Sequence, residues 1–424
     1  MASKVYCAAI KICKKLGYDI DRRLENDTTY LHKAVLSNKK KLILELIRNK
    51  ANINIQEING ETPLHYAAKN YNKEIVKILI ENGADINARN SDNNTPFHLA
   101  SGMSKVNKGI IELFLQHDAN VNVKGNKGFT PLHFAAKSNQ IWLAKQNTLT
   151  LIKHGANINA QSDEDGRGYS LLHKAVVAGD EDMVKSLILN GANVNFQSST
   201  NGKTPLHLAN SASKYVFQAR FKAIEYRTPL VYENALKSRG NVIQMLIHNG
   251  ANLDTLDKNG YMPLYYAAHA DDDNIAFKIL IKNGAKVNSK IENFIPLMYY
   301  LLQENMFDCA KILLQNGGDI ETIYGNGDTI LMNAVKQHRI SKCKGVIKWL
   351  LENGANGNAR NKKVGYTAME LAIDMDFDDI VSLMICYGVS LKKPNSIGHD
   401  SVERTLVAKK IKVFKTILVS QQMF

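Results

Sequence analysis

The 424-residue chain lacks any apolar run long enough to cross a bilayer. A transmembrane helix needs about 20 mostly apolar residues in a row. Near the N-terminus, M1-A-S-K-V-Y-C-A-A-I-K-I-C-K-K15 places lysines inside its short apolar stretch. Those lysines interrupt the continuous apolar segment that a secretory signal needs. The sequence therefore predicts neither a membrane span nor a secretory signal.

Cysteine is scarce and scattered along the chain. The five cysteines form no C-x-x-C pair and are Cys7, Cys13, Cys309, Cys343 and Cys386. A disulfide framework favours an even number of cysteines, and a zinc site favours closely spaced ones. We therefore expect free thiols in a reducing, cytoplasmic compartment, with no metal and no cofactor.

Catalytic motifs are also missing. No G-x-x-x-x-G-K-[ST] occurs, which excludes a P-loop at the level of the motif. The run D374-M-D-F-D-D379 begins like a calcium loop, but Asp379 replaces the required glycine and Ile385 replaces the closing glutamate. The sequence predicts a protein that is not an enzyme.

The formal charge of +14 is concentrated at the two ends of the chain. Residues 1–50 contribute +7 and residues 391–424 contribute +5, which leaves +2 for residues 51–390. A basic groove along the whole chain is therefore not expected. The basic ends leave open an alternative function, in which they tether the chain to a membrane surface or to nucleic acid.

A short motif recurs along most of the chain at nearly regular intervals, except for one long interval between His207 and Tyr265. Its copies are T29-Y-L-H32, T62-P-L-H65, T95-P-F-H98, T130-P-L-H133, S170-L-L-H173, T204-P-L-H207, M262-P-L-Y265, I295-P-L-M298, T329-I-L-M332 and T367-A-M-E370. In nine of the ten cases a second element such as N82-G-A-D-I-N87 follows before the next copy begins. Threonine and proline begin a helix, and glycine ends one. Each copy therefore predicts a pair of helices.

These motifs resemble the ankyrin repeat. The resemblance covers residues 26 to about 390 and implies an all-α solenoid of stacked helix-turn-helix units joined by β-turn loops. It also implies that the recurring histidine is a hydrogen-bonding brace between a helix start and the neighbouring turn. His32, His65, His98, His133, His173 and His207 are therefore predicted to be structural, and not metal ligands.

The repeats predict five regions. These are an N-terminal capping half-repeat (1–25), repeats 1 to 5 with the start of repeat 6 (26–210), an irregular segment (211–235), the end of repeat 6 with repeats 7 to 10 (236–390), and C-terminal capping helices (391–424). The irregular segment lies in the long interval between His207 and Tyr265. It is either a helical insertion in one repeat or a truncated extra repeat, and the late alanine at Ala235 favours the insertion.

The ankyrin resemblance implies that a partner protein binds the concave side, through turns and first helices. Large aromatic residues occupy two positions predicted to be exposed there. They are Phe129, Tyr169, Tyr261 and Tyr366 before the helix start, and Tyr66, Phe134 and Tyr266 after the histidine. Shelter against neighbouring turns is the alternative role for these rings.

The irregular segment adds Arg220 and Phe221 as predicted partner contacts, and its net positive charge favours an acidic partner surface. The sequence thus predicts a non-catalytic protein-binding scaffold. Nucleic acid is not expected as a partner, and a membrane only through the basic amphipathic helix within 401–419. The lysine-, asparagine- and isoleucine-rich composition resembles ankyrin proteins of intracellular bacteria or large DNA viruses, which implies a host-directed effector.

Overall fold

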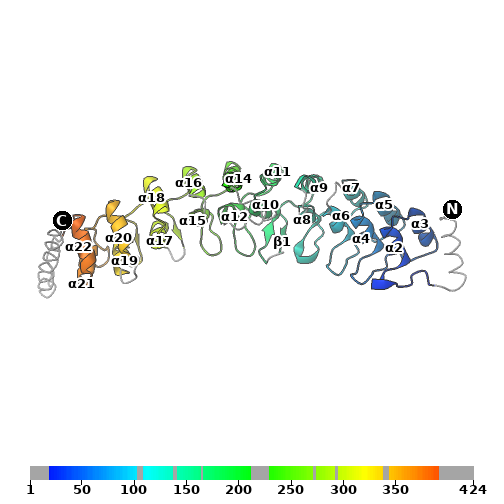
Figure 1. The fold of residues 1–424 in the computed structure, drawn as a ribbon, viewed down its shortest axis with the longest axis horizontal. Coiled ribbons are helices and arrows are strands. Elements are labelled where there is room, and N and C mark those ends of the chain that lie inside the picture. Colours follow the sequence, from blue (N-terminus) through cyan, green and yellow to red (C-terminus); the bar gives the residue numbers. More distant parts are fainter. Residues whose placement is uncertain are drawn as a thin grey trace. The chain divides into compact units, whose positions relative to one another are not determined.

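The computed structural model describes residues 19–102, 108–136, 141–163, 166–211, 229–270, 274–291, 295–337 and 343–390. Contacts between Cα atoms divide the chain into two units. The first unit comprises Met1–Ala209 and Tyr215–Ala251, and the second comprises Asn210–Lys214 and Asn252–Phe424. In each unit the described residues form helix pairs, with first helices in one row and second helices in another (Figure 1).

The first unit holds six helix pairs, counted by their described helices. Its first helices are α2 (Tyr30–Leu36), α4 (Pro63–Lys69), α6 (Pro96–Ser101), α8 (Pro131–Ala136), α10 (Leu171–Ala178) and α12 (Pro205–Ser211). Its second helices are α3 (Lys40–Arg48), α5 (Lys73–Glu81), α7 (Lys108–Gln116), α9 (Ile141–Lys153), α11 (Glu181–Leu189) and α14 (Pro229–His248). Short 3₁₀ turns, η1 (Glu25–Asp27) and η2 (Asn126–Gly128), precede α2 and α8.

The second unit repeats the arrangement in four described pairs. Its first helices are α15 (Pro263–Ala268), α17 (Leu297–Gln303), α19 (Ile330–Lys336) and α21 (Ala368–Asp374). Its second helices are α16 (Ile275–Lys282), α18 (Phe307–Gln315), α20 (Cys343–Glu352) and α22 (Asp378–Cys386). The prediction of an all-α fold built from stacked helix pairs is confirmed in both units.

Regular strand is confined, in the described residues, to three antiparallel hairpins of very short strands. They are β1 (Gln161–Ser162) with β2 (Tyr169–Ser170), β3 (Lys290–Ile291) with β4 (Ile295–Pro296), and β5 (Ile323–Tyr324) with β6 (Asp328–Thr329). Each hairpin leads directly into a first helix, so these strands are the arms of the turns between repeats.

Repeat 2 shows why these residues fold as a helix pair. Thr62 has an extended backbone and caps α4, and Pro63 occupies the first turn, where its missing N–H leaves no bond unmade. Ala67 and Ala68 are fully buried, so α4 packs closely against α2 and α6. Gly83 ends the pair with a φ of +90°, a conformation that is strained for residues with a side chain.

The second helices supply much of the core. In α5, Ile75, Val76 and Leu79 are almost completely buried. Burying one such aliphatic side chain stabilises the folded chain by about 1.5–3 kcal/mol before entropy costs are counted. Because α5 contacts α4 and α7, its apolar face is covered within the repeat and by the next repeat. The stability of each repeat therefore depends on the neighbouring repeats, as in other repeat proteins.

A ladder of asparagines joins the exit loops of successive repeats. Asn54 donates from Nδ2 to the carbonyl of Gly83 and accepts from the amide of Asp85, at 3.3 and 2.8 Å. Asn122 and Asn288 bond in the same way to the next exit loop along the chain. These bonds satisfy loop backbone groups and fix the spacing between repeats.

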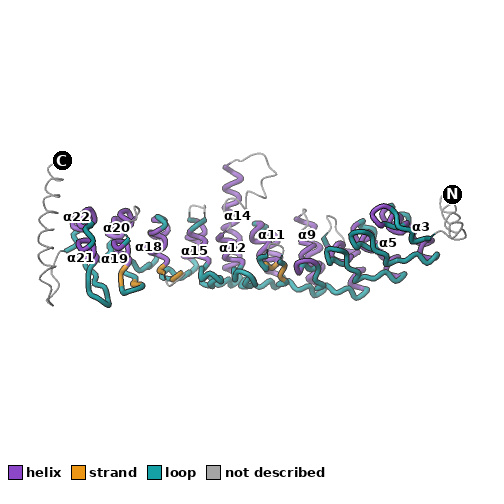
Figure 2. The backbone as a smooth tube through the Cα atoms, turned by 90° about the horizontal axis from the view of Figure 1, so that it is seen from below, coloured by secondary structure: helices purple, strands orange, loops and turns teal. Residues whose placement is uncertain are grey.

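The same ladder crosses the long interval between His207 and Tyr265. Asn195 Nδ2 donates to the carbonyl of Gly250 at 2.8 Å, so the exit loops of repeats 5 and 6 are neighbours. Helix α14 is continuous over 20 residues and extends beyond α11 in Figure 2. Its buried Arg239 donates from Nε to the carbonyl of Ala209 at 2.8 Å.

These contacts favour a helical insertion within one repeat over a truncated extra repeat. The motif T228-P-L230 would begin the first helix of a new repeat. In the structure, Pro229 and Leu230 instead begin α14, which is the second helix of repeat 6. Residues 212–228 lie outside the described residues, so the boundaries of the irregular segment stay predictions.

The predicted caps fall largely outside the described residues, which exclude 1–18 and 391–424. At the start of the described chain, the carboxylate of Asp21 accepts from the amide of Asn52 at 3.0 and 3.1 Å, as Asn54 accepts from the amide of Asp85 in the next repeat. The half-repeat over 1–25 stays a prediction, because residues 1–18 lie outside the described residues. Among the described helices, none combines the length and the apolar character needed to cross a bilayer.

Candidate interaction face and the contacts between repeats

His65 joins its own helix start to the turn of the following repeat. Its Nδ1 accepts from the amide of Thr62 at 3.1 Å and lies 2.9 Å from the Thr62 hydroxyl. Because Nδ1 accepts, the ring proton is on Nε2, which donates to the carbonyl of Asn94 at 3.0 Å. The ring is fully buried. Both nitrogens are therefore used in structural bonds.

The same bridge recurs in the first unit. His32, His98 and His173 contact the carbonyls of Glu61, Phe129 and Lys203 at 3.1, 3.2 and 3.0 Å. His133 and His207 make the same contacts to their own helix starts. The predicted brace is confirmed for His32, His65, His98 and His173.

Burial determines the charge state of these rings. Burial disfavours the charged form and lowers the pKa of His98 and of His173 to about 4, and it also lowers the pKa of His32 and His65. The four rings are therefore neutral at pH 7. Within the described ranges, no group of three or more His, Cys, Asp or Glu residues is arranged to hold a metal ion.

In the second unit, other residues occupy the brace position, defined as the third residue after the N-cap of a first helix. They are Tyr265, Tyr299, Met332 and Glu370. The sequence motif I295-P-L-M298 placed the start of repeat 8 one residue too early. Its N-cap is Pro296, at the end of the β3–β4 hairpin, so Tyr299 occupies the brace position instead of Met298.

Side chains on the first helices carry the links between repeats in the second unit. His269 Nε2 lies 2.9 Å from the Tyr300 hydroxyl. Gln303 Nε2 donates to Gln337 Oε1 at 2.7 Å. Lys336 Nζ donates to the Tyr366 hydroxyl at 2.6 Å. The links thus run between the ends of successive first helices, or from a first helix to the next turn.

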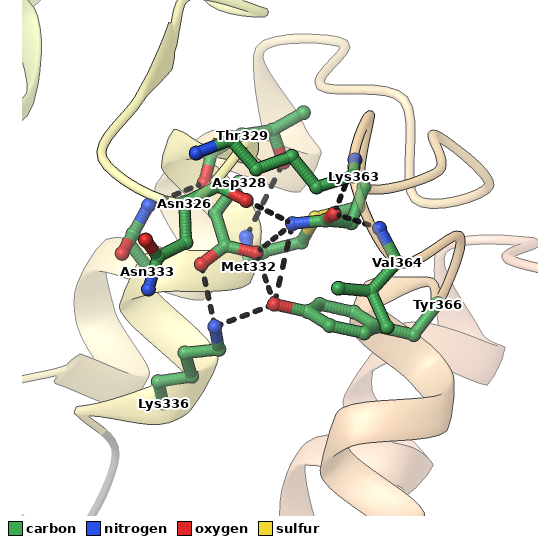
Figure 3. A network of polar contacts seen from close by, with 10 residues as sticks. Asn326, Asp328, Thr329, Met332, Asn333, Lys336, Lys363, Val364 and Tyr366 are labelled. Carbon is green, nitrogen blue, oxygen red and sulfur yellow. Dashed lines mark hydrogen bonds and ion pairs between the residues drawn. The ribbon is translucent and has the colours of Figure 1, made fainter.

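The Lys336 link belongs to a compact polar network between repeats 9 and 10 (Figure 3). The Asp328 carboxylate accepts from Lys336 Nζ at 2.5 Å, the Tyr366 hydroxyl at 2.5 Å and Asn361 Nδ2 at 2.7 Å. Burial disfavours ionisation of Asp328, but these hydrogen bonds outweigh it and lower its pKa. The polar groups of the network are directed at one another. The network is a structural link between repeats.

The aromatic positions predicted from the sequence divide into exposed and buried ones. Partly exposed rings, which the prediction requires, belong to Tyr66, Phe129, Phe134, Tyr261, Tyr266 and Tyr366. The expected exposure is wrong for Tyr169, which is 8% exposed. It lies in β2, and its ring stacks on His173 with centroids 5.2 Å apart and an interplanar angle of 5°. Arg220 and Phe221 lie outside the described residues.

Phe129 is partly covered by neighbouring side chains, which is the alternative role predicted for these rings. Lys174 Nζ lies 4.6 Å from its ring centroid, and the rings of His133 and Phe134 lie 5.6 and 5.9 Å away. Tyr366 is likewise tied to Asp328 through its hydroxyl. The position directly after the brace residue is therefore the more accessible one for a partner.

Sequence reasoning missed Tyr300, which occupies that position in repeat 8. The pair Tyr265-Tyr266 recurs one repeat later as Tyr299-Tyr300, and that recurrence is the sequence feature that identifies it. We call the partly exposed rings at this position, Tyr66, Phe134, Tyr266 and Tyr300, the first-helix aromatics.

Known proteins share the repeat pattern of this chain. A family model described as ankyrin repeats (3 copies) matches residues 2–90, 87–162, 141–219, 233–324 and 297–395. The nuclear factor NF-kappa-B p105 subunit of Gallus gallus is 28% identical over 230 residues, which is 53% of this chain and 21% of that protein. The putative ankyrin repeat protein L92 of Acanthamoeba polyphaga mimivirus is 27% identical over 178 residues, 40% of this chain and 42% of that protein.

Both matches span less than half of the relative's own length. Among solved structures, the ankyrin repeat domain of Bcl-3 matches with a TM-score of 0.48 and 22% identity, covering 60% of this chain and 99% of that chain.

Proposed function

Because this chain belongs to the ankyrin repeat family, we propose that it is a non-catalytic scaffold that binds a partner protein through its first helices and turns. Ankyrin repeats are generally protein-interaction modules, and the second helices here are occupied with the core. The observation that carries the proposal is the recurrence of the first-helix aromatics at one position of the first helix, in repeats 2, 4, 7 and 8. Large rings with few rotatable bonds are the usual anchors of protein interfaces.

The first-helix aromatics are also held in place before any partner arrives. The Tyr66 ring packs edge-on against His32 with centroids 5.3 Å apart, and Phe134 does the same against His98. The Tyr266 hydroxyl donates to Asp257 Oδ2 at 2.6 Å. Preorganised side chains lose little entropy on binding. A partner would therefore meet an ordered surface.

The irregular segment is included in the proposal. Arg220 and Phe221, with the surrounding positive charge, would contact an acidic surface on the partner and contribute to partner choice. A cytoplasmic location, in the host if the chain is exported, fits the scattered, odd-numbered cysteines. The similarity to L92, an ankyrin repeat protein of a mimivirus, supports a host-directed role.

The proposal is tested by affinity capture from host-cell lysate, followed by measurement of the captured protein's affinity for variants. Tyr66→Ala with Phe134→Ala should weaken binding about tenfold or more, without lowering the melting temperature by more than a few degrees. Leu189→Ala, which alters an exposed side chain on α11, is the matched control and should bind normally. Arg220→Ala with Phe221→Ala tests the irregular segment separately. Unchanged affinity in the Tyr66 and Phe134 variant would contradict the proposed face.

A further inference from the structure

Five aromatic rings of repeats 7 and 8 form one continuous cluster in the second unit. We call Tyr261, Tyr265, Tyr266, His269 and Tyr300 the tyrosine–histidine cluster. Tyr265 is at its centre, with ring centroids 4.0 Å from Tyr261, 5.3 Å from Tyr266, 4.7 Å from His269 and 5.2 Å from Tyr300. All four tyrosines are partly exposed and His269 is exposed.

Hydrogen bonds fix the orientation of these rings. His269 Nδ1 donates to the carbonyl of Tyr265 at 2.9 Å, so Nε2 accepts from the Tyr300 hydroxyl, also at 2.9 Å. The Tyr265 hydroxyl lies 3.2 Å from the Tyr300 hydroxyl and completes the chain. The cluster is therefore a rigid aromatic surface shared by two repeats.

The segments that carry the cluster are acidic, in contrast to the chain as a whole. Of the described residues, 261–270 and 295–310 contain no lysine or arginine but hold Glu304 and Asp308. Glu304 caps α17 one turn after Tyr300 and is exposed.

The corresponding segment of repeat 2 is electrically balanced. Residues 61–74 contain Lys69 and Lys73 together with Glu61 and Glu74. The segments of the tyrosine–histidine cluster therefore carry net negative charge at a place where another repeat carries none, in a chain whose formal charge is +14.

Elsewhere, this chain already places cations on rings of the same kind. Lys174 Nζ lies 4.6 Å from the Phe129 centroid, and Lys336 Nζ lies 4.9 Å from the Tyr366 centroid. Aromatic faces attract cations electrostatically, and nearby carboxylates add to the attraction. Among the described residues, no lysine or arginine lies over the ring of Tyr265 or Tyr300.

We infer that the tyrosine–histidine cluster receives an arginine or lysine side chain from a basic segment of the partner protein. The inference rests on the proposed function and specifies the chemistry of one part of the binding face. The cluster would bind a basic segment of the partner, whereas Arg220 and Phe221 are predicted to contact an acidic surface. The two surfaces therefore contact different regions of a partner.

The test uses the full chain and three fluorescein-labelled octapeptides in which arginine, glutamine or glutamate alternates with glycine. Fluorescence anisotropy at low ionic strength measures binding. The arginine peptide should bind saturably, the glutamine peptide at least about fivefold more weakly, and the glutamate peptide not at all. Raising the salt concentration should weaken arginine-peptide binding, because exposed charges are screened.

Variants locate the bound peptide. Tyr300→Leu, which keeps bulk but removes the ring, should weaken arginine-peptide binding about fivefold or more, whereas Tyr300→Phe should retain most of it. Glu304→Gln should weaken it by a smaller factor. Tyr30→Leu, which makes the same change at an exposed tyrosine outside the cluster and outside the first-helix aromatics, is the matched control and should have no effect. Melting curves of each variant separate lost binding from lost folding.

The inference is overturned if the arginine peptide fails to bind at about millimolar concentration, if all three peptides bind equally, or if Tyr300→Leu binds as the wild type does. The proposed function is judged separately, by the captured partner. If Tyr66→Ala with Phe134→Ala still weakens that partner while the peptides fail, only the inference about the cluster is wrong.

Discussion

At the scale of single residues, the recurring histidine is the clearest link between sequence and structure. Each bridge uses one ring nitrogen within a repeat and the other between repeats, as His65 does with Thr62 and Asn94. A metal ligand or a catalytic base needs a nitrogen available for other chemistry, and these bridges use both. The period of the motif already indicated this role, because copies about one repeat apart cannot share a metal.

Replacing His65 with alanine should destabilise the chain by about 1–3 kcal/mol. The change leaves the buried carbonyl of Asn94 and the amide of Thr62 without their partner, and a buried polar group without a partner is costly. Urea unfolding measures the difference. His248→Ala is the matched control, because His248 is exposed on α14, and it should cost far less. Equal stability of the His65 variant and the wild type would refute the brace.

Exposure of individual rings was harder to predict than their position. Tyr169 and Tyr261 occupy equivalent places before a helix start, yet Tyr169 is buried and Tyr261 is partly exposed. Tyr169 stacks flat on His173, while Tyr261 stacks on another tyrosine at the brace position. The sequence identifies the position, but neighbouring side chains decide whether the ring faces solvent.

At the scale of elements, the two units use different contacts for the same purpose. The first unit links repeats by buried histidines, and the second links them by side chains on its first helices and turns. The Asp328 network is the most buried of these links, with 4% of the Asp328 side chain and 31% of the Lys336 side chain exposed. The network therefore stabilises the pairing of repeats 9 and 10.

Asp328→Asn should destabilise the second unit by about 1–3 kcal/mol, because it leaves the partly buried Lys336 without its counter-ion. Lys344→Met is the control, since it breaks the exposed pair between Lys344 and Asp379, and exposed pairs contribute about 0–1 kcal/mol. Denaturant unfolding of both variants gives the comparison. An equal, small effect of the two changes would show that the network adds little stability.

The predicted insertion in repeat 6 can be tested by deletion. The interval from His207 to Tyr265 is much longer than that from His65 to His98, and removing residues 212–236 makes the two equal. Ser238 and Arg239, which bond to Gly179 and Ala209, remain. The shortened chain should keep its helix content and melt within a few degrees of the wild type, by circular dichroism. A large loss of helix or cooperativity would favour the truncated-repeat interpretation.

In repeat 8, the local sequence does not determine the residue at which the first helix begins. The motif I295-P-L-M298 contains the expected proline, yet the hairpin of β3 and β4 makes Pro296 the N-cap and Leu297 the first helical residue. Proline is compatible with both positions, so local sequence does not separate the two registers. The repeated tyrosine pair separates them, because aligning Tyr299-Tyr300 with Tyr265-Tyr266 puts Tyr299 at the brace position.

At the scale of the whole molecule, the different links predict different responses of the two units to acid. In the unfolded chain the histidines titrate near their ordinary pKa of 6.5, whereas in the folded chain His98 and His173 have a pKa of about 4. Between these values the unfolded chain binds more protons, so stability falls as pH falls. Each of these two rings contributes roughly 3 kcal/mol to this loss.

In the second unit, the shifts of Asp328 and Glu321 do not produce this loss in that pH range. The pKa of Asp328 is already below its ordinary value, so its contribution is lost only in more acidic solution. The pKa of Glu321 is raised by burial, which gives the opposite sign. The chain has two tryptophans, Trp142 in α9 and Trp349 in α20, one in each unit.

Urea unfolding followed by tryptophan fluorescence should separate these responses. In Trp349→Phe the remaining Trp142 reports the first unit, and in Trp142→Phe the remaining Trp349 reports the second. From pH 7 to pH 4.5, the urea midpoint should fall more in Trp349→Phe than in Trp142→Phe. Replacing His98 and His173 with glutamine should reduce the difference. Equal shifts in both units would contradict the assignment of acid sensitivity to the buried histidines.

The proposed function requires that first helices and turns bind a partner protein while second helices form the core. Hydrogen–deuterium exchange of the free chain and of its complex with the captured partner tests it most directly. We expect added protection in segments such as 62–69, 129–136 and 261–269, with no change in second helices such as 73–81 and 181–189. Protection confined to the second helices, or no protection in the first helices and turns, would contradict it.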